Sequence, residues 1–447
     1  MSIGGLIRNS SYAKGPGESG PRPQARAATD GPDTSRHDGL GHIVSNRQRD
    51  VRILIGARRA MTEKGQHGLF ERLQRQGWPV GARRDRRSGP SRPDRRMTLA
   101  ALLRHLGFAA LLVLLSAASV RGMIAARVMD TPEARKAHDR PTPKGGGVGV
   151  VVTFLVGIAV LYRFAEFARL ANPYFLGVIE ASVAIAVVAF LDDLFDWPFT
   201  VKLGAQVLAA LVAVSSGLYV TDFRVPYLGP LTVTWIGITA TLLWLLFTTN
   251  AMNFIDGLNG LASGVALIAC LFLAFIAEQH GGWFAYAASG LLAAGLAGFL
   301  PFNFPKARIF LGDVGSQFVG FMLAVLAVVA SRFDGVELSF LLMPMLLSGV
   351  LFDVAFTLAR RALQGESVTK PHRGHLYQVA QRSGLSPVVV TLVHWGFAIF
   401  GGACCLLFIA APSAFKPPVP FITVLPQLMW VWFVVHRARA AGLRHWG

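Results

Sequence analysis

The sequence predicts an all-α, polytopic membrane protein with about 10–11 transmembrane helices. Of its 447 residues, 53% are hydrophobic and only 15% are charged, which is too apolar for a soluble domain of this length. Apolar runs long enough to cross a bilayer recur along the chain. Clusters of aspartate, asparagine, histidine and arginine interrupt them, and carboxylates beside hydrocarbon are functional by default.

The apolar runs give the expected helices in order. They fall at roughly 98–120, 146–165, 173–191, 203–219, 231–250, 258–277, 283–300, 314–331, 338–359, 386–411 and 418–435. The run at 203–219 is the shortest. Small residues within the runs, as in the segment 293–298, allow helices to pack closely in a membrane.

The loop charges predict the orientation. Lysine and arginine crowd the loop 121–145, the loop 360–385 and the C-terminal tail, and alternating spans place all three on one side. The positive-inside rule makes that side cytoplasmic. The same alternation brings the polar segments 192–202, 250–257 and 301–313 to that side. We therefore expect a multi-pass protein of the inner (plasma) membrane with an active site facing the cytoplasm.

Residues 1–96 differ from the rest of the chain. They hold 20 of the lysines and arginines but only nine aspartates and glutamates, and they lack long apolar periodicity. We expect a basic disordered arm or an upstream translation artefact, with the integral membrane domain at 97–447. A basic tail can bind nucleic acid, but that role would leave the polar clusters unexplained, so we expect no nucleic-acid partner.

Asp192, Asp193 and Asp196 close the third predicted span. If the helix continues through them, Asp192 and Asp196 share a face and Asp193 lies beside it. Such a cluster suits a Mg²⁺ site or a general base acting on a phosphate or hydroxyl. The simpler alternative is a solvated helix end, but acids at a helix C-terminus oppose the macrodipole. A positive group should therefore lie nearby, and Lys202 is a candidate.

A second polar segment recurs with a three-residue spacing. Asn250, Asn253, Asp256 and Asn259 would form a stripe on a helical turn, and the interleaved glycines permit close approach of a ligand to the backbone. The alternative is an ordinary interhelical hydrogen-bond ladder.

Two further segments suit phosphate. The sequence from Phe310 through Gly312 and Asp313 to Ser316 opens a helix, where Asp313 could be a simple N-cap or could hold a metal-bridged phosphate. In the loop before the second span, a triple glycine exposes backbone amides. Its basic residues are Lys136, Arg140 and Lys144. That loop is a candidate phosphate cradle or a plain positive-inside loop.

His372, Arg373 and His375 form the last cluster. Neither a cysteine nor a third histidine completes a zinc site, so a loop that binds phosphate or sugar is favoured. The three cysteines, Cys270, Cys404 and Cys405, lie in apolar runs and give neither a disulfide framework nor a zinc spacing.

Together, these segments resemble the polyprenyl-phosphate N-acetylhexosamine-1-phosphate transferases, a membrane glycosyltransferase family (family 4). Five motifs occur in family order, and the resemblance covers about 121–380. It implies transfer of an N-acetylhexosamine-1-phosphate, or of a 6-deoxy relative, from a UDP-sugar to undecaprenyl phosphate with release of UMP. The loop 371–378 looks like the branch that initiates O-antigen and related cell-surface polysaccharides.

The resemblance also assigns roles to residues. Asp192 and Asp193 match the acidic pair, in which one member is proposed to deprotonate the lipid phosphate, and Asp256 matches an essential active-site acid. Asn253 and Asp313 match positions implicated in binding Mg²⁺, for which Mn²⁺ is the alternative. Phe310 and Gly312 match residues near the uracil ring, and His372, Arg373 and His375 match a loop thought to recognise the sugar and pyrophosphate. Apart from the resemblance, the basic loop and the polar stripe lead us to expect substrate contacts also from Lys136, Arg140, Lys144, Asn250 and Asn259.

One departure is Asn259, where the family often has a second aspartate. Two other functions stay open. One is transfer of the phospho-muramyl-pentapeptide precursor of peptidoglycan, and the other is a membrane transporter, whose site normally lies near the midplane between repeated halves. The expected partners are undecaprenyl phosphate, a UDP-amino sugar and membrane lipid, and a homodimer is the assembly that we keep open.

Overall fold

The computed structural model describes residues 99–130, 141–164, 173–221, 223–225, 229–231, 233–332, 338–367, 370, 372–443 and 446. The described residues fall within one compact unit, Arg96–Gly447. The expectations for residues 1–96 lie outside the described residues.

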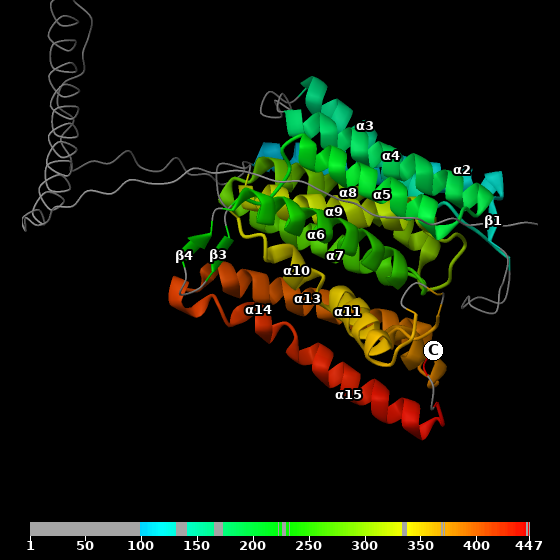
Figure 1. Cartoon of the computed structure of the whole chain (residues 1–447). Coiled ribbons are helices and arrows are strands. Elements are labelled where there is room, and N and C mark those ends of the chain that lie inside the picture. The colour runs from blue at the N-terminus through cyan, green and yellow to red at the C-terminus, as the bar shows by residue number, and fades with distance from the viewer. Residues whose placement is uncertain are drawn as a thin grey trace, which may run out of the picture. The chain divides into compact units, whose positions relative to one another are not determined.

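The described residues are almost entirely helical, as the sequence predicts (Figure 1). The elements are α2 (Leu99–Ala126), β1 (Met129–Asp130), β2 (Thr142–Pro143), α3 (Gly147–Phe164), α4 (Pro173–Phe195), α5 (Phe199–Ser215), β3 (Phe223–Val225), β4 (Gly229–Leu231), α6 (Thr234–Ile255), α7 (Leu261–His280), α8 (Trp283–Asn303), α9 (Gly312–Arg332), α10 (Leu342–Leu346), α11 (Ser348–Leu363), α12 (Leu376–Arg382), α13 (Pro387–Ala410), a 3-10 turn (Ser413–Phe415), α14 (Val419–Ile422) and α15 (Leu425–Ala440).

Among the described residues, nine helical segments are long and apolar enough to cross a membrane. The all-α polytopic prediction is confirmed, and two of the expected spans differ in detail. The run expected at 203–219 is α5, a shorter apolar helix of 17 residues. The run expected at 338–359 is divided into α10 and α11 at Leu347, whose φ of −96° and ψ of 12° depart from helical values.

Small residues let the outer helices approach α8. A Cβ added at Gly298 would lie 2.5 Å from the Val113 carbonyl oxygen of α2, and one at Gly295 would lie 3.1 Å from Cα of Val150 in α3. Ser116 donates a hydrogen bond from Oγ to the Gly295 carbonyl at 2.7 Å. Between helices in a membrane, close packing of this kind and interhelical hydrogen bonds replace the hydrophobic driving force.

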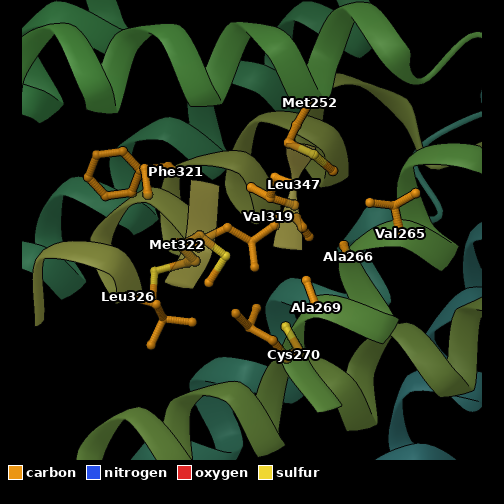
Figure 2. Close-up of a cluster of buried hydrophobic side chains, with 14 of the residues drawn as sticks. Met252, Val265, Ala266, Ala269, Cys270, Val319, Phe321, Met322, Leu326 and Leu347 are labelled. Carbon is orange, nitrogen blue, oxygen red and sulfur yellow. The ribbon is translucent and has the colours of Figure 1, made fainter. Parts of the chain in front are cut away.

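Helix α9 is the most enclosed of these spans. Within the 18-residue apolar stretch by which each helix could cross a membrane, 94% of α9 is buried, against 11% of α2 and 28% of the segment that ends in α15. Figure 2 shows Val319, Phe321, Met322 and Leu326 of α9 among buried residues of α6 and α7. This packing holds the first turn of α9 in place, and the polar site is built around that turn.

Two short antiparallel hairpins lie at opposite ends of the helices (Figure 1). In one, β1 pairs with β2, so that Asp130 faces Thr142 at the end where α4 stops and α9 starts. In the other, β3 pairs with β4. The functional site lies at the β1 end.

Candidate active site

Polar ends of several helices enclose a cavity of about 310 Å³. Its walls come from the end of α4, the start of α5, the end of α6, the start of α9 and the segment around α12. The lining residues are Asp130, Lys144, Asp192, Asp193, Asp196, Lys202, Asn253, Asp256, Gly257, Leu258, Asn259, Asn303, Phe310, Leu311, Gly312, Asp313, Arg373, Gln378 and Gln381.

Lys202 lies at the centre of the acidic wall. Its Nζ is 3.0 Å from Oδ2 of Asp192 and 3.0 Å from Oδ2 of Asp313. The expectation of a positive group near the acidic pair is confirmed by this geometry. One ammonium therefore joins α5 to both α4 and α9, and it offsets repulsion between two carboxylates that share a site.

Asp193 closes the N-terminus of α9 from another helix. Its Oδ1 accepts a hydrogen bond from the Asp313 N–H at 3.2 Å, and its Oδ2 accepts one from the Val314 N–H at 3.1 Å. A carboxylate at a helix N-terminus satisfies donors that the helix cannot pair and interacts favourably with the macrodipole. Asp313 is thus not the cap of its own helix but a first-turn residue facing the cavity.

The glycine-rich loop docks against the same turn. Gly146 and Gly147 donate backbone hydrogen bonds to the carbonyls of Phe310 and Leu311, at 2.9 and 2.8 Å. A Cβ at Gly147 would lie 2.1 Å from Cα of Gly315, so these two backbones touch. The glycines therefore serve helix contact, and Lys144 beside them is held by Asp196 at 3.3 Å.

Asp196 does not continue the helix. Helix α4 ends at Phe195, and Asp196 has a positive φ of 49° with an exposed side chain. The condition for Asp192 and Asp196 to share a helical face is therefore not met, because the helix ends one residue before Asp196 and Asp196 itself adopts the left-handed conformation.

The polar stripe on α6 divides between two tasks. Asn253 Nδ2 donates to Asp313 Oδ1 at 3.0 Å and to Ser316 Oγ at 2.9 Å, at the cavity wall. Asn250 instead donates from Nδ2 to Gln206 Oε1 at 2.6 Å and does not line the cavity. Gln206 in turn donates to Gln317 at 2.9 Å, which places a buried chain of amides behind the acids.

Asp256 follows the end of α6, half-buried in the cavity wall. Burial, followed by the charges of Asp313 and Asp193, raises the pKa of this carboxyl well above the ordinary 3.8. A carboxyl of this kind holds its proton to higher pH than a free aspartate, which suits acid–base work near neutrality.

Asn259 lies beyond the helix, so it does not share the stripe of Asn253. It lines the cavity, and its Nδ2 donates to the Pro305 carbonyl at 3.3 Å. Asn303 accepts from the Gly260 N–H at 2.6 Å and donates to the Ile309 carbonyl at 3.0 Å, which ties the loop after α6 to the loop before α9.

The histidine loop turns partly away from the cavity. Arg373 lines the cavity, whereas His372 and His375 do not, and their rings stack at 5.0 Å between centroids. His375 Nδ1 lies 3.2 Å from Oδ1 of the buried Asp353 on α11. Asp353 also accepts backbone hydrogen bonds that open α12, from Leu376 at 3.0 Å and from Tyr377 at 2.9 Å.

Most of the sequence-predicted residues therefore meet at one cavity. Those that line it are Asp192, Asp193, Asp256, Asn253, Asp313, Lys144, Asn259, Phe310, Gly312 and Arg373. Lys136 and Arg140 lie outside the described residues. Asn250, His372 and His375 do not line the cavity. The functional roles assigned to all of these residues stay predictions.

Sequence reasoning missed three positioning residues. Asp353 stands alone in an apolar run, and an isolated acid inside a predicted span was the available signal. Gln206 and Asn303 carried no signal of their own, because single amides occur at many interhelical contacts.

The cavity fits a divalent cation. Six aspartates line it against three basic residues, and Oδ1 of Asp192 is buried without a hydrogen-bond partner among the described residues. Among the described residues, no three or more His, Cys, Asp or Glu side chains are arranged so that they alone could hold a metal ion. Mg²⁺ nevertheless binds through one or two carboxylates together with substrate phosphates and water, so a dedicated cage is unnecessary.

Comparison with known proteins identifies the family. The model for glycosyl transferase family 4 matches residues 175–331. A probable undecaprenyl-phosphate N-acetylglucosaminyl 1-phosphate transferase of Bacillus subtilis is 32% identical over 267 residues, which are 59% of this chain and 73% of that protein. The chain belongs to glycosyl transferase family 4. The resemblance inferred from the motifs is thereby confirmed.

Two other relatives carry the names of related transferases. The decaprenyl-phosphate N-acetylglucosaminephosphotransferase of Mycobacterium tuberculosis is 31% identical over 307 residues, covering 62% of this chain and 75% of that protein. A phospho-N-acetylmuramoyl-pentapeptide-transferase of Acetivibrio thermocellus is 29% identical over 290 residues, covering 60% and 81%. The family-4 match spans α4 to α9, which supply the acidic wall of the cavity.

Proposed function

We propose that this membrane transferase moves an N-acetylhexosamine-1-phosphate, or a 6-deoxy relative, from a UDP-sugar to undecaprenyl phosphate and releases UMP. The observation that carries the proposal is the junction of Asp192, Lys202 and Asp313 in the wall of a cavity formed by helix ends. A cavity at the ends of apolar helices can receive a lipid phosphate and a soluble sugar nucleotide together.

In this reaction, an oxygen of the lipid phosphate attacks the β-phosphorus of the UDP-sugar. The bond from that phosphorus to the bridging oxygen breaks, and UMP leaves with the electron pair. One phosphoanhydride replaces another, so catalysis consists of positioning and of neutralising charge. Lys202, Lys144 and Arg373 are the described cavity residues that supply positive charge.

The two neighbouring acids have different surroundings. Both oxygens of Asp193 accept backbone hydrogen bonds from α9, so its carboxylate holds that helix in place. Asp192 gives one oxygen to Lys202 and leaves the other without a partner among the described residues. Asp192 is therefore our candidate for the group that accepts a proton from the lipid phosphate, and Asp193 is the candidate for the positioning residue.

We further propose that Mg²⁺, or Mn²⁺ in its place, is held by Asp313 and Asn253. The excess of carboxylates in the cavity supports this assignment, because two anionic substrates would otherwise meet a negative wall. When bound, the cation would polarise phosphate oxygens and offset their charge. Asn253 Nδ2 donates to Asp313 Oδ1 at 3.0 Å, so the two side chains lie side by side, and the cation would be held by the amide Oδ1 of Asn253 and by the Asp313 carboxylate.

For the pathway, we propose initiation of a cell-surface polysaccharide such as O-antigen, at the cytoplasmic face of the inner membrane. The N-acetylglucosamine-1-phosphate transferases among the relatives support this choice. The alternative is transfer of the muramyl-pentapeptide precursor, the reaction named for a less similar relative. A transporter is disfavoured, because the acids lie at helix ends instead of the midplane.

The deciding experiment measures UMP release by the purified full chain in detergent with undecaprenyl phosphate and Mg²⁺. The donors are UDP-N-acetylglucosamine, a 6-deoxy UDP-N-acetylhexosamine and the UDP-muramyl-pentapeptide. We expect lipid-dependent release with one of the first two donors, lost in Asp192→Asn and Asp313→Asn. Release only with the pentapeptide donor would move the protein to the alternative reaction. Folded protein that releases no UMP with any donor would overturn the proposal.

A further inference from the structure

A second pocket lies on the same side of the molecule, between the C-terminal ends of α11 and α15. Its volume is about 660 Å³, roughly twice that of the cavity described above. Arg360 and Arg439 line it together with Glu366 and with apolar groups that include Phe356 and Trp446. None of these residues takes part in the proposed transfer reaction.

The positive charge of this pocket is only partly compensated. Glu366 is paired with Arg361 at 2.8 Å, which leaves Arg360 and Arg439 as the excess. Arg360 donates from Nη1 to Gln364 at 3.1 Å, but its Nε and Nη2 have no hydrogen-bond partner among the described residues. Buried guanidinium donors without acceptors are costly, and a phosphate oxygen is their strongest natural partner.

The apolar part of the pocket continues onto a lipid-facing helix. Trp446 lies against Arg360, with the guanidinium carbon 5.2 Å from the ring centroid. Along α15, Leu428, Met429 and Trp432 are 52%, 71% and 70% exposed, as expected of side chains in contact with acyl chains. Two arginines at helix ends beside an exposed apolar face and a tryptophan are typical of the membrane–water interface.

We propose that this pocket binds the phosphate of an anionic membrane phospholipid, with the acyl chains along the exposed face of α15. The same phosphate chemistry could come from free phosphate or from the prenyl-phosphate substrate. The apolar face of α15 favours a phospholipid, and the separate set of lining residues distinguishes this pocket from the cavity that would hold the substrates.

A phospholipid bound here would also stabilise the cavity proposed to bind the substrates, because one side chain connects the two sites. Arg382 donates from Nη1 both to the Arg373 carbonyl at 3.1 Å and to the Trp446 carbonyl at 3.2 Å. Trp446 lines the second pocket and Arg373 lines the first cavity. The Arg382 guanidinium therefore links the backbones of the two sites.

The test is native mass spectrometry of the full chain in detergent, titrated with phosphatidylglycerol or phosphatidylcholine. The variants are Arg439→Gln, which removes an exposed pocket residue, and Arg360→Gln. Lys370→Gln, which removes an exposed cation on the loop after α11 and outside the pocket, is the control. We expect preferential binding of phosphatidylglycerol, weakened roughly tenfold by either pocket variant and unchanged by the control.

The remaining outcomes contradict the proposal. An equal loss in Lys370→Gln would mean a diffuse positive surface, and equal binding of both lipids would mean that charge is not recognised. Displacement of phosphatidylglycerol by millimolar inorganic phosphate, or by a short-chain prenyl phosphate at stoichiometric amounts, would assign the site to those ligands instead. The melting temperature of each variant separates a lost site from lost folding, and Arg439→Gln removes no buried group.

Discussion

Lys202 Nζ lies 3.0 Å from Oδ2 of Asp313, and this contact joins α5 to the first turn of the most enclosed helix. The same ammonium lies 3.0 Å from Asp192. Removing Lys202 from this partly buried network leaves two neighbouring carboxylates without their shared counter-charge, which destabilises the site. The arrangement of Asp192 and Asp313 in the cavity wall therefore depends on the positive charge of Lys202.

We expect Lys202→Met to lower UMP release by at least about 100-fold, the scale for loss of one group that stabilises transition-state charge. The melting temperature should also fall, because Asp192 and Asp313 then repel each other. Lys306→Met is the control, since Lys306 is an exposed lysine on the loop before α9. Wild-type turnover in Lys202→Met would exclude a role for this junction in the reaction.

The acidic pair can be separated by comparing Asp192→Asn with Asp193→Asn. An asparagine at 193 keeps only one oxygen that can accept a backbone hydrogen bond from α9. The loss of the other hydrogen bond should lower stability by about 1 kcal/mol. An asparagine at 192 removes the candidate base and leaves α9 capped. We expect Asp192→Asn to abolish UMP release with little change in melting temperature, and Asp193→Asn to lower both. The reverse pattern would assign the base to Asp193.

Sequence reasoning found the helices and most of the acidic wall because both leave local signals. Apolar length predicts spans, and carboxylates at span ends stand out against hydrocarbon. The spacing of Asn253 and Asp256 was informative because both lie at the end of α6, so local geometry persists into the structure.

The remainder depends on contacts between helices. Nothing near Asp193 in the sequence announces that it caps a helix 120 residues later. The same holds for Asp353, which opens α12 from α11. Asp196 was misplaced because the helical repeat was extended one residue too far, into a left-handed turn. Long-range pairing of this kind requires the tertiary packing.

Gly147 tests the docking of the glycine loop. A Cβ there would lie 2.1 Å from Cα of Gly315, and neither backbone can move without shifting α3 or α9. We expect Gly147→Ala to cost about 1–3 kcal/mol through overpacking and to lower the melting temperature accordingly. Gly204→Ala, where a Cβ inside α5 meets nothing within 4 Å, should instead raise it slightly, because alanine favours a helix interior over glycine. Equal melting temperatures for the two variants would refute the close contact.

His372 predicts a pH dependence of stability. Burial, followed by the electrostatic influence of the neighbouring His375 and of the positive charges of Arg361 and Arg360, lowers the pKa of His372 from 6.5 to about 4. The Gly374 N–H also donates to its Nδ1 at 3.2 Å, a bond that only the neutral ring accepts.

Between these two pH values the unfolded chain binds a proton that the folded chain does not. Stability therefore rises with pH across this window, and the contribution is complete above 6.5 and lost as pH falls toward 4. We expect the melting temperature of wild type to fall more steeply on acidification than that of His372→Gln. The exposed His436 supplies the control, His436→Gln, which should follow wild type. Parallel curves for wild type and His372→Gln would contradict the shift.

Asp353 gives the most discriminating prediction. Its side chain contacts no side chain that lines the cavity, yet it holds the start of α12, next to the cavity residues Arg373 and Gln378. Its carboxylate accepts from the Leu376 and Tyr377 N–H groups and lies 3.2 Å from His375. In Asp353→Ala, these buried donors lose their acceptor, at about 1–3 kcal/mol for each group left unsatisfied. In Asp353→Asn one oxygen remains, so the loss should be smaller. Thr357→Val, which removes only a 3.3 Å contact to the same carboxylate, should have the mildest effect.

Activity then separates positioning from mere destabilisation. A protein that is partly unfolded loses apparent kcat while the remaining molecules keep their KM. If Asp353 instead positions the segment that carries Arg373 and Gln378, the KM for the UDP-sugar should rise in Asp353→Asn while the KM for undecaprenyl phosphate stays near wild type. Steady-state UMP release with each substrate varied in turn makes this measurement. An unchanged KM for both substrates would reduce Asp353 to a residue that stabilises the fold, because a displaced Arg373 must alter contacts with whichever phosphate it reaches.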